Sequence, residues 1–163
     1  MTTRAITPAE YRKLLLHAPM HTRLALRVAW ETGLRVSDIL GIKTADVKAA
    51  MTITERKTGN QRSVTLSPSL VHALRDYGRS MCDDNGRAIP VHRTTVYRTI
   101  RAIAAACDMG PGVSMHSVRK SWAQRYAKEH GLTATQHALG HRSKITTLIY
   151  VSDLWAADQQ ATA

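Results

Sequence analysis

The spacing of hydrophobic positions predicts two helices at the start of the chain. Thr7 is a suitable N-cap, Pro8 fits the first helical position, and Glu10 completes a capping box. Apolar side chains then recur at the spacing of the buried face of a helix. The same spacing returns over residues 21–32, and Gly33 favours a helix end there in the left-handed conformation.

The period of the pattern falls to two in the middle of the chain. Met51, Ile53 and Glu55 alternate with Thr52, Thr54 and Arg56, and the alternation resumes at Val64 and Leu66. Alternation of this kind is typical of strands, and Gly59-Asn60 between the two runs is suited to a tight turn. The sequence therefore predicts a β-hairpin.

Helical spacing dominates the rest of the chain. Further helices are expected from the N-cap Ser37 to Leu40, over 69–77, over 94–107, from the N-cap Ser114 over 115–130, from the N-cap Thr133 to Leu139, and over 144–151. Turn-forming residues predict a loop over 79–91. The fold class is therefore mostly α with one small antiparallel β-hairpin, in a single domain.

Charge adds a functional signal to this fold. The 163 residues include 23 Lys and Arg against 12 Asp and Glu, a net charge of +11. Such an excess favours a polyanionic partner, most often nucleic acid, although some cytoplasmic proteins are basic without one. Basic residues occur along the whole chain, which indicates a folded basic surface and not a charged tail.

Composition also argues against several other classes of protein. No apolar run approaches the ~18 residues that a membrane span needs, and the N-terminal segment lacks the apolar stretch of a signal peptide. Two cysteines, Cys82 and Cys107, are too few for a disulfide framework or a zinc cluster. We therefore expect a cytoplasmic protein with unpaired cysteines and no membrane contact.

Four short segments hold six candidates for chemistry: Arg35, Lys57, His116, Arg119, His141 and Tyr150. Arg35 lies in a turn between two predicted helices, and Lys57 lies at the predicted hairpin tip. His116 and Arg119 are three residues apart, so on a helix they share one face, which suits a phosphate. Taken singly, each candidate is more often a surface or packing residue.

The order and spacing of these segments carry more information than any one of them. The segments are Thr32-Gly33-Leu34-Arg35 with Asp38 following, Lys57, His116-x-x-Arg119, Leu139-Gly140-His141, and Thr146-Thr147-x-x-Tyr150. This arrangement resembles the complete catalytic set of the tyrosine recombinases, the phage integrase family. The resemblance spans nearly the whole chain and implies a tyrosine-recombinase catalytic-domain fold with site-specific DNA recombination as its activity.

The resemblance implies a role for each candidate. Tyr150 is the nucleophile that forms a 3′-phosphotyrosyl link, Arg35 and Arg119 hold the nonbridging oxygens, His141 adds a hydrogen bond, His116 accepts a proton or orients a neighbour, and Lys57 protonates the leaving 5′-oxygen. The expected partner is double-stranded DNA, on which the protein assembles as a multimer, near the nucleoid in a bacterium. No metal, cofactor or small-molecule substrate is implied.

This sequence also departs from the family pattern. Lys120 stands where the family often has histidine, and residues 47–50 leave little room for the extra strand usual before the hairpin. The chain begins about where the family's N-terminal DNA-clamp domain would end, so it is an isolated catalytic domain or a minimal recombinase. Leu154 and Trp155 are candidate anchors on a neighbouring protomer.

Three other interpretations compete with this one. A type IB topoisomerase shares the same chemistry, but the short spacing from Leu-Gly-His to Tyr150 and the small domain favour a recombinase. A DNA-binding accessory protein with a decayed site is disfavoured by the intact set. His137 and His141, four residues apart, could form a metal pair on one helix, but no third ligand is evident.

Overall fold

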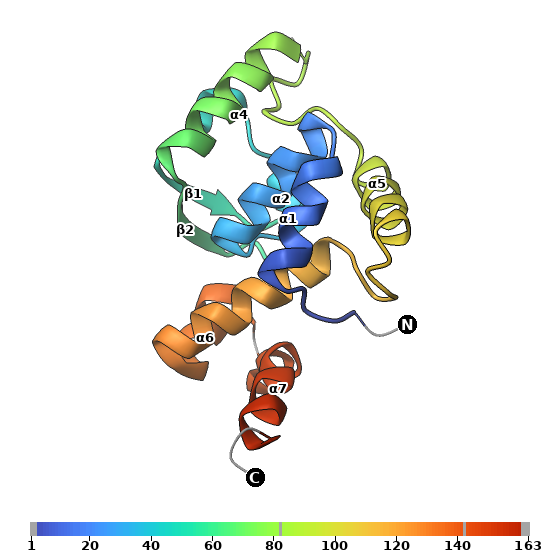
Figure 1. Cartoon of the computed structure of the whole chain (residues 1–163). Helices are drawn as coiled ribbons and strands as arrows, with labels where there is room; N and C mark the ends of the chain where they lie inside the picture. Colours follow the sequence, from blue (N-terminus) through green and yellow to red (C-terminus); the bar gives the residue numbers. More distant parts are fainter. Residues whose placement is uncertain (1–2, 82, 142, 161–163) are drawn as a thin grey trace.

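The computed structural model describes residues 3–81, 83–141 and 143–160, with the backbone alone over 153–160. Its centre is α2 (Met20–Thr32), which contacts five other helices and the second strand of the hairpin. Helix α1 (Pro8–His17) lies along α2 (Figure 1) and begins with the predicted capping box of Thr7 and Glu10. Gly33 ends α2 with φ +65°, as predicted. No helix within the described residues is both long and apolar enough to cross a bilayer.

The predicted hairpin is confirmed. Strands β1 (Ala50–Thr54) and β2 (Gln61–Thr65) pair antiparallel, with Met51 opposite Val64. The sheet has two strands among the described residues, and the segment before it forms the 3-10 helix η1 (Thr44–Asp46) and an isolated bridge. As expected, the described segment directly before the hairpin forms no further strand.

Helix α3 (Val36–Ile39) starts earlier than predicted. Its N-cap is Arg35, not Ser37, because the chain leaves the left-handed turn at Gly33 already extended at Arg35, with φ −72° and ψ 148°. The Ser37 hydroxyl lies 3.5 Å from Asp38 Oδ1 and caps nothing. The shift matters because it makes a candidate residue, Arg35, the N-cap of the helix.

Helix α4 (Pro68–Met81) runs past the predicted end at residue 77. Gly78 lies inside the helix and is buried against Thr44. A side chain at this position would collide with Thr44, so glycine is required here although it often ends helices. Part of the loop that follows belongs to the hydrophobic core, because Ala88 and Ile89 are fully buried. Helix α5 (Arg93–Ala106) then follows as predicted and ends beside the free, half-buried Cys107; Cys82 lies outside the described residues.

The last two helices form a smaller unit below the main core (Figure 1). Helix α6 (Met115–Leu139) begins with Ser114 as its N-cap and is kinked at Gly131, where φ is +79° and ψ is 173°. The predicted break after residue 130 is confirmed, but the second part begins before Thr133, so the predicted cap at Thr133 is wrong. Helix α7 (Lys144–Gln160) packs mainly on α6 and is longer than predicted. A separate apolar cluster joins the two helices: Trp122, Ala123, Leu139 and Val151. This cluster positions the helix that carries Tyr150.

Candidate active site

The turn after α2 directs Arg35 toward the site. Gly33 needs both its positive φ and its lack of a side chain, because a Cβ there would overlap the Trp122 ring. Leu34 is buried and anchors the turn from the core side. Arg35 follows with its side chain 17% exposed, and its Nη1 lies 2.8 Å from Glu55 Oε1. The guanidinium is therefore held by an ion pair and still reaches solvent.

The hairpin tip brings Lys57 to the same region. The amide of Gly59 donates to the Glu55 carbonyl at 2.8 Å, and the Glu55 amide donates to the Asn60 carbonyl at 2.9 Å, so the tip is a closed loop. Lys57 lies on this loop with an exposed side chain. Its positive charge acts on His116, which places the ammonium within electrostatic range of α6.

Arg119 is the most deeply placed of the candidates. Its side chain is 1% exposed; Nη1 donates to the Gly33 carbonyl and Nη2 donates to the Leu139 carbonyl at 2.9 Å. Its buried Nε has no hydrogen-bond partner. Arg119 therefore fixes both turns of the site to each other, and a side-chain hydrogen bond with Tyr150 favours its charged form. His116, one helical turn earlier, is exposed.

Tyr150 meets both candidate histidines. Its ring centroid lies 5.1 Å from that of His141, edge to face, and 6.4 Å from that of His116. The Nδ1 atom of His141 lies 3.0 Å from Thr147 Oγ1, which holds the ring against α7. Gly140, with φ +65°, ends α6 just before His141. The Leu-Gly-His turn thus faces the tyrosine.

Burial and the neighbouring cations shift the pKa values of several groups in the site. Burial, and then repulsion by Arg119 and Arg35, lower the pKa of His141 to about 4. Partial burial of its imidazole, followed by repulsion from Arg119, Arg35 and Lys57, likewise lowers the pKa of His116, although the residue as a whole is exposed. Both imidazoles are accordingly neutral at pH 7, when each can accept a proton. Burial and Arg35 also lower the pKa of Arg119, whereas Tyr150 and Glu55 oppose this shift.

All six candidates are therefore brought together, from α3, the hairpin tip, α6, the turn after α6, and α7. The metal pair considered for His137 and His141 is not formed on one helix, because Gly140 ends the helix between them. No cluster of three or more potential metal ligands occurs among the described residues. The described residues thus bring together a tyrosine hydroxyl, two imidazoles and several cations.

Comparison with known proteins agrees with this geometry. The family model described as "Phage integrase family" matches residues 4–155. The chain belongs to the phage integrase family. A tyrosine recombinase of Pseudothermotoga lettingae is 29% identical over 157 residues, which cover 90% of this chain and 55% of that protein. The chain spans about half the length of most of the curated relatives it matches.

Solved structures confirm the predicted fold class. The crystal structure of XerA recombinase superposes with a TM-score of 0.79 at 24% identity, covering 100% of this chain and 66% of that one. The lambda integrase catalytic core superposes with a TM-score of 0.68 at 26% identity, covering 86% of this chain and 93% of that one. This integrase-family chain thus has the fold of a tyrosine-recombinase catalytic domain.

Two residues of this integrase-family site were missed by sequence reasoning. Glu55 is a buried carboxylate paired with Arg35. The guanidinium of Arg62 lies 5.0 Å from the centroid of the Trp122 ring. Burial and Arg119 lower the pKa of Arg62 to about 10. The alternating pattern of the hairpin was the one available signal, since it puts Glu55 on the inward face. Lys120, the departure from the family pattern, is buried.

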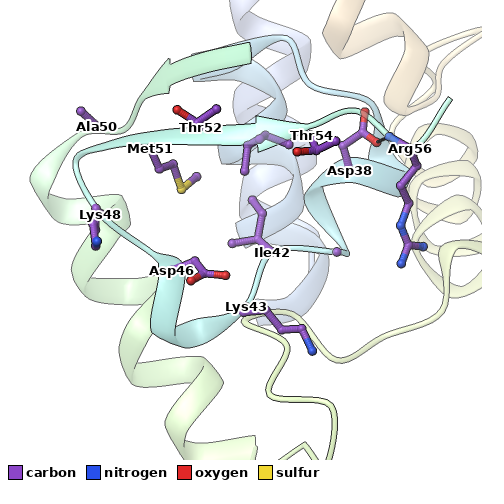
Figure 2. A pocket seen from close by; sticks show the side chains of 12 residues that line it. Asp38, Ile42, Lys43, Asp46, Lys48, Ala50, Met51, Thr52, Thr54 and Arg56 are labelled. Carbon is purple, nitrogen blue, oxygen red and sulfur yellow. Dashed lines mark hydrogen bonds between the residues drawn. The ribbon is translucent and has the colours of Figure 1, made fainter. Parts of the chain in front are cut away.

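A different hollow of about 510 Å³ lies along β1 (Figure 2). The basic residues Arg56, Lys43 and Lys48 line it together with Asp38 and Asp46. None of the six candidates lines this hollow. The hairpin register therefore separates Lys57, which acts on His116, from its basic neighbours. Leu154 and Trp155, the candidate anchors, have side chains outside the described residues.

Proposed function

We propose that this chain cleaves and rejoins DNA strands as a site-specific tyrosine recombinase, with Tyr150 as the nucleophile. The observation that carries the proposal is the convergence of Tyr150 with two neutral imidazoles and two arginines in a chain of the phage integrase family. One of Arg35, Arg119 or Tyr150 facing away from the others would have favoured a decayed accessory protein; the electrostatic contacts of Arg119 with both Arg35 and Tyr150 instead support the recombinase.

The proposed step is a transesterification that conserves the phosphodiester energy. The Tyr150 oxygen attacks phosphorus, its proton passes to His116, and the bond from phosphorus to the 5′-oxygen breaks. A 3′-phosphotyrosyl link forms, and Lys57 gives a proton to the departing 5′-oxygen. Rejoining is the reverse reaction, with the 5′-hydroxyl as nucleophile, so no ATP is needed.

Fixed cations support the charge that develops on phosphorus. Arg35 reaches solvent, and Arg119 is hydrogen-bonded to Tyr150, the proposed nucleophile. Planar guanidinium groups match the nonbridging oxygens better than a point charge does. Preorganised donors of this kind supply what a metal ion supplies in other phosphoryl-transfer sites, so the proposed step requires no metal.

The proposed partner is double-stranded DNA, bound by a multimer. Lambda integrase, one of the matched proteins, has been solved as a tetramer bound to a Holliday junction. The net charge of +11 supports contact with the same kind of polyanion here. We further propose that residues 1–163 act as one catalytic domain.

The test is a library of nicked suicide substrates, in which cleavage releases a short strand and traps the covalent complex. We expect adducts on denaturing gels, and sequencing of the trapped DNA should return a recurrent site. Adducts on all sequences alike, with relaxation of plasmid lacking a specific site, would instead indicate a topoisomerase. The absence of any adduct over the library contradicts the proposal.

A further inference from the structure

Glu55 is a carboxylate that interacts electrostatically with Arg35, Arg119 and Arg62. Neither the sequence motifs nor the proposed chemistry gives it a role. It lies between the end of β1 and the loop that carries Lys57. Its side chain is 1% exposed, although isolated buried carboxylates are strongly disfavoured. A charged group in this position therefore requires compensating partners, and those partners indicate what it does.

Both carboxylate oxygens and the backbone of Glu55 contact other residues. Oε1 lies 2.8 Å from Arg35 Nη1, and Oε2 accepts a hydrogen bond of 2.8 Å from the Thr58 hydroxyl. The carboxylate also lies against Gly140, where a Cβ would approach Oε2 to 2.8 Å. The Glu55 backbone closes the hairpin tip through Gly59 and Asn60. One residue thus touches three of the segments that supply candidate residues.

The charge of Glu55 is stabilised in place. Burial alone would raise the pKa of its carboxyl, but the Thr58 hydroxyl, Arg35 and Arg119 outweigh burial and lower it. Glu55 is therefore a carboxylate at neutral pH. Its negative charge in turn favours the protonated form of Arg119 and offsets part of the repulsion between Arg119 and Arg35.

Relative exposure decides between two roles for this ion pair. A carboxylate on the solvent side of Arg35 would occupy the phosphate position and block it. Glu55 is 1% exposed and Arg35 is 17% exposed, so the carboxylate lies on the protein side and leaves the solvent-facing part of the guanidinium for a phosphate. The pair is therefore a support beneath the anion site.

We propose that Glu55 is a positioning residue for DNA cleavage, which holds the Arg35 guanidinium and ties the Lys57 loop to the Gly140-His141 turn. The inference rests on the proposed function, because positioning has meaning only for a site that cleaves DNA. Glu55 touches no reacting atom in this account. It acts through Arg35, so its effect should disappear when Arg35 is absent.

The test is a double-mutant cycle of Glu55→Gln and Arg35→Ala, measured by single-turnover cleavage at saturating DNA. Glutamine keeps the size and the acceptor for Thr58 but removes the charge. Groups that orient a functional ligand typically contribute ~10–100-fold to activity, so we expect Glu55→Gln to lower the cleavage rate by about that factor, with DNA affinity little changed. Glu31→Gln is the matched control, a half-buried carboxylate paired with Ser67 outside the site, and should cleave at the wild-type rate.

In the Arg35→Ala background, Glu55→Gln should cause no further loss of rate. It should also raise the melting temperature of Arg35→Ala, because it removes a buried charge that has lost its partner. Wild-type cleavage by Glu55→Gln, or losses that multiply in the double variant, overturn the inference. If Glu55→Gln does not fold, Glu55→Asp, which keeps the charge but withdraws it from Arg35, should show the rate loss; wild-type cleavage by Asp overturns the inference equally. Absence of adducts with the wild-type protein refutes the proposed function instead, so the two failures are distinguishable.

Discussion

Replacing Lys57 with alanine should remove a proton donor and leave the fold intact. The Lys57 side chain is exposed at the hairpin tip, and the backbone bonds that close the tip do not involve it. Surface substitutions of this kind change the free energy of unfolding by less than ~0.5 kcal/mol. For a domain of this size that corresponds to a melting-temperature shift of about 1–2 °C. Any large loss of cleavage is therefore chemical.

The expected loss follows from the leaving group. The 5′-oxygen departs as an alkoxide whose conjugate acid resembles water, with a pKa of ~15.7, whereas a thiol has a pKa of ~8.5. General-acid catalysis typically contributes ~10²–10⁴-fold to the rate. We expect Lys57→Ala to lose about that factor on normal DNA. On a 5′-bridging phosphorothiolate, where sulfur leaves without a proton, most of the loss should disappear.

The assay is single-turnover cleavage of matched oxygen and sulfur suicide substrates. Arg56→Ala is the control, because Arg56 is equally exposed and adjacent but lines the separate hollow along β1, and it should cleave both substrates normally. Arg119→Ala should be impaired on both substrates, since its role is to hold phosphate oxygens. Failure of sulfur to rescue Lys57→Ala would refute the assignment of Lys57 as the acid.

Three further predictions concern the arginine fork, the turn and the imidazole. Arg35→Lys should lower single-turnover cleavage by ~10²–10³-fold, because an ammonium lacks the planar fork; a wild-type rate would contradict bidentate binding. Gly33→Ala should destabilise the protein by about 1–3 kcal/mol in urea unfolding, since its Cβ overlaps the Trp122 ring, and an unchanged midpoint would disprove the contact. The pKa of His141 is about 4 in the folded protein, below the ~6.5 of an unfolded chain. The unfolded chain therefore binds the proton more tightly, so lowering the pH from ~6.5 to about 4 favours unfolding. This loss of stability is absent only above pH ~6.5. His141→Asn should flatten that part of the curve of melting temperature against pH, and an unchanged slope would contradict the shift.

Local signals made much of the fold predictable. The capping box of Thr7 and Glu10 involves residues three apart, and the left-handed end at Gly33 depends on that residue alone. The hairpin register follows from side-chain alternation around one turn. In each case the physical cause lies within a few residues of its effect, so a single sequence contains it.

Contacts between distant residues were not predictable in this way. Helix α4 continues past residue 77 because Gly78 packs on Thr44, and Arg119 is bound by carbonyls that lie 86 and 20 residues away. The spacing of motifs placed the six candidate residues on suitable elements. It could not reveal Glu55, whose partner Arg35 belongs to another segment and is recognised only when the two are seen side by side.

The central claim is that Tyr150 becomes covalently joined to DNA, and one substitution tests it directly. Tyr150→Phe removes a single oxygen from a half-buried ring, so the fold and the affinity for DNA should persist. Tyr77→Phe is the matched control, a half-buried tyrosine on α4 away from the site. On nicked suicide substrates, the wild-type and Tyr77→Phe proteins should form adducts that migrate with the protein on denaturing gels, and Tyr150→Phe should form none. Adducts of normal yield from Tyr150→Phe would contradict the account.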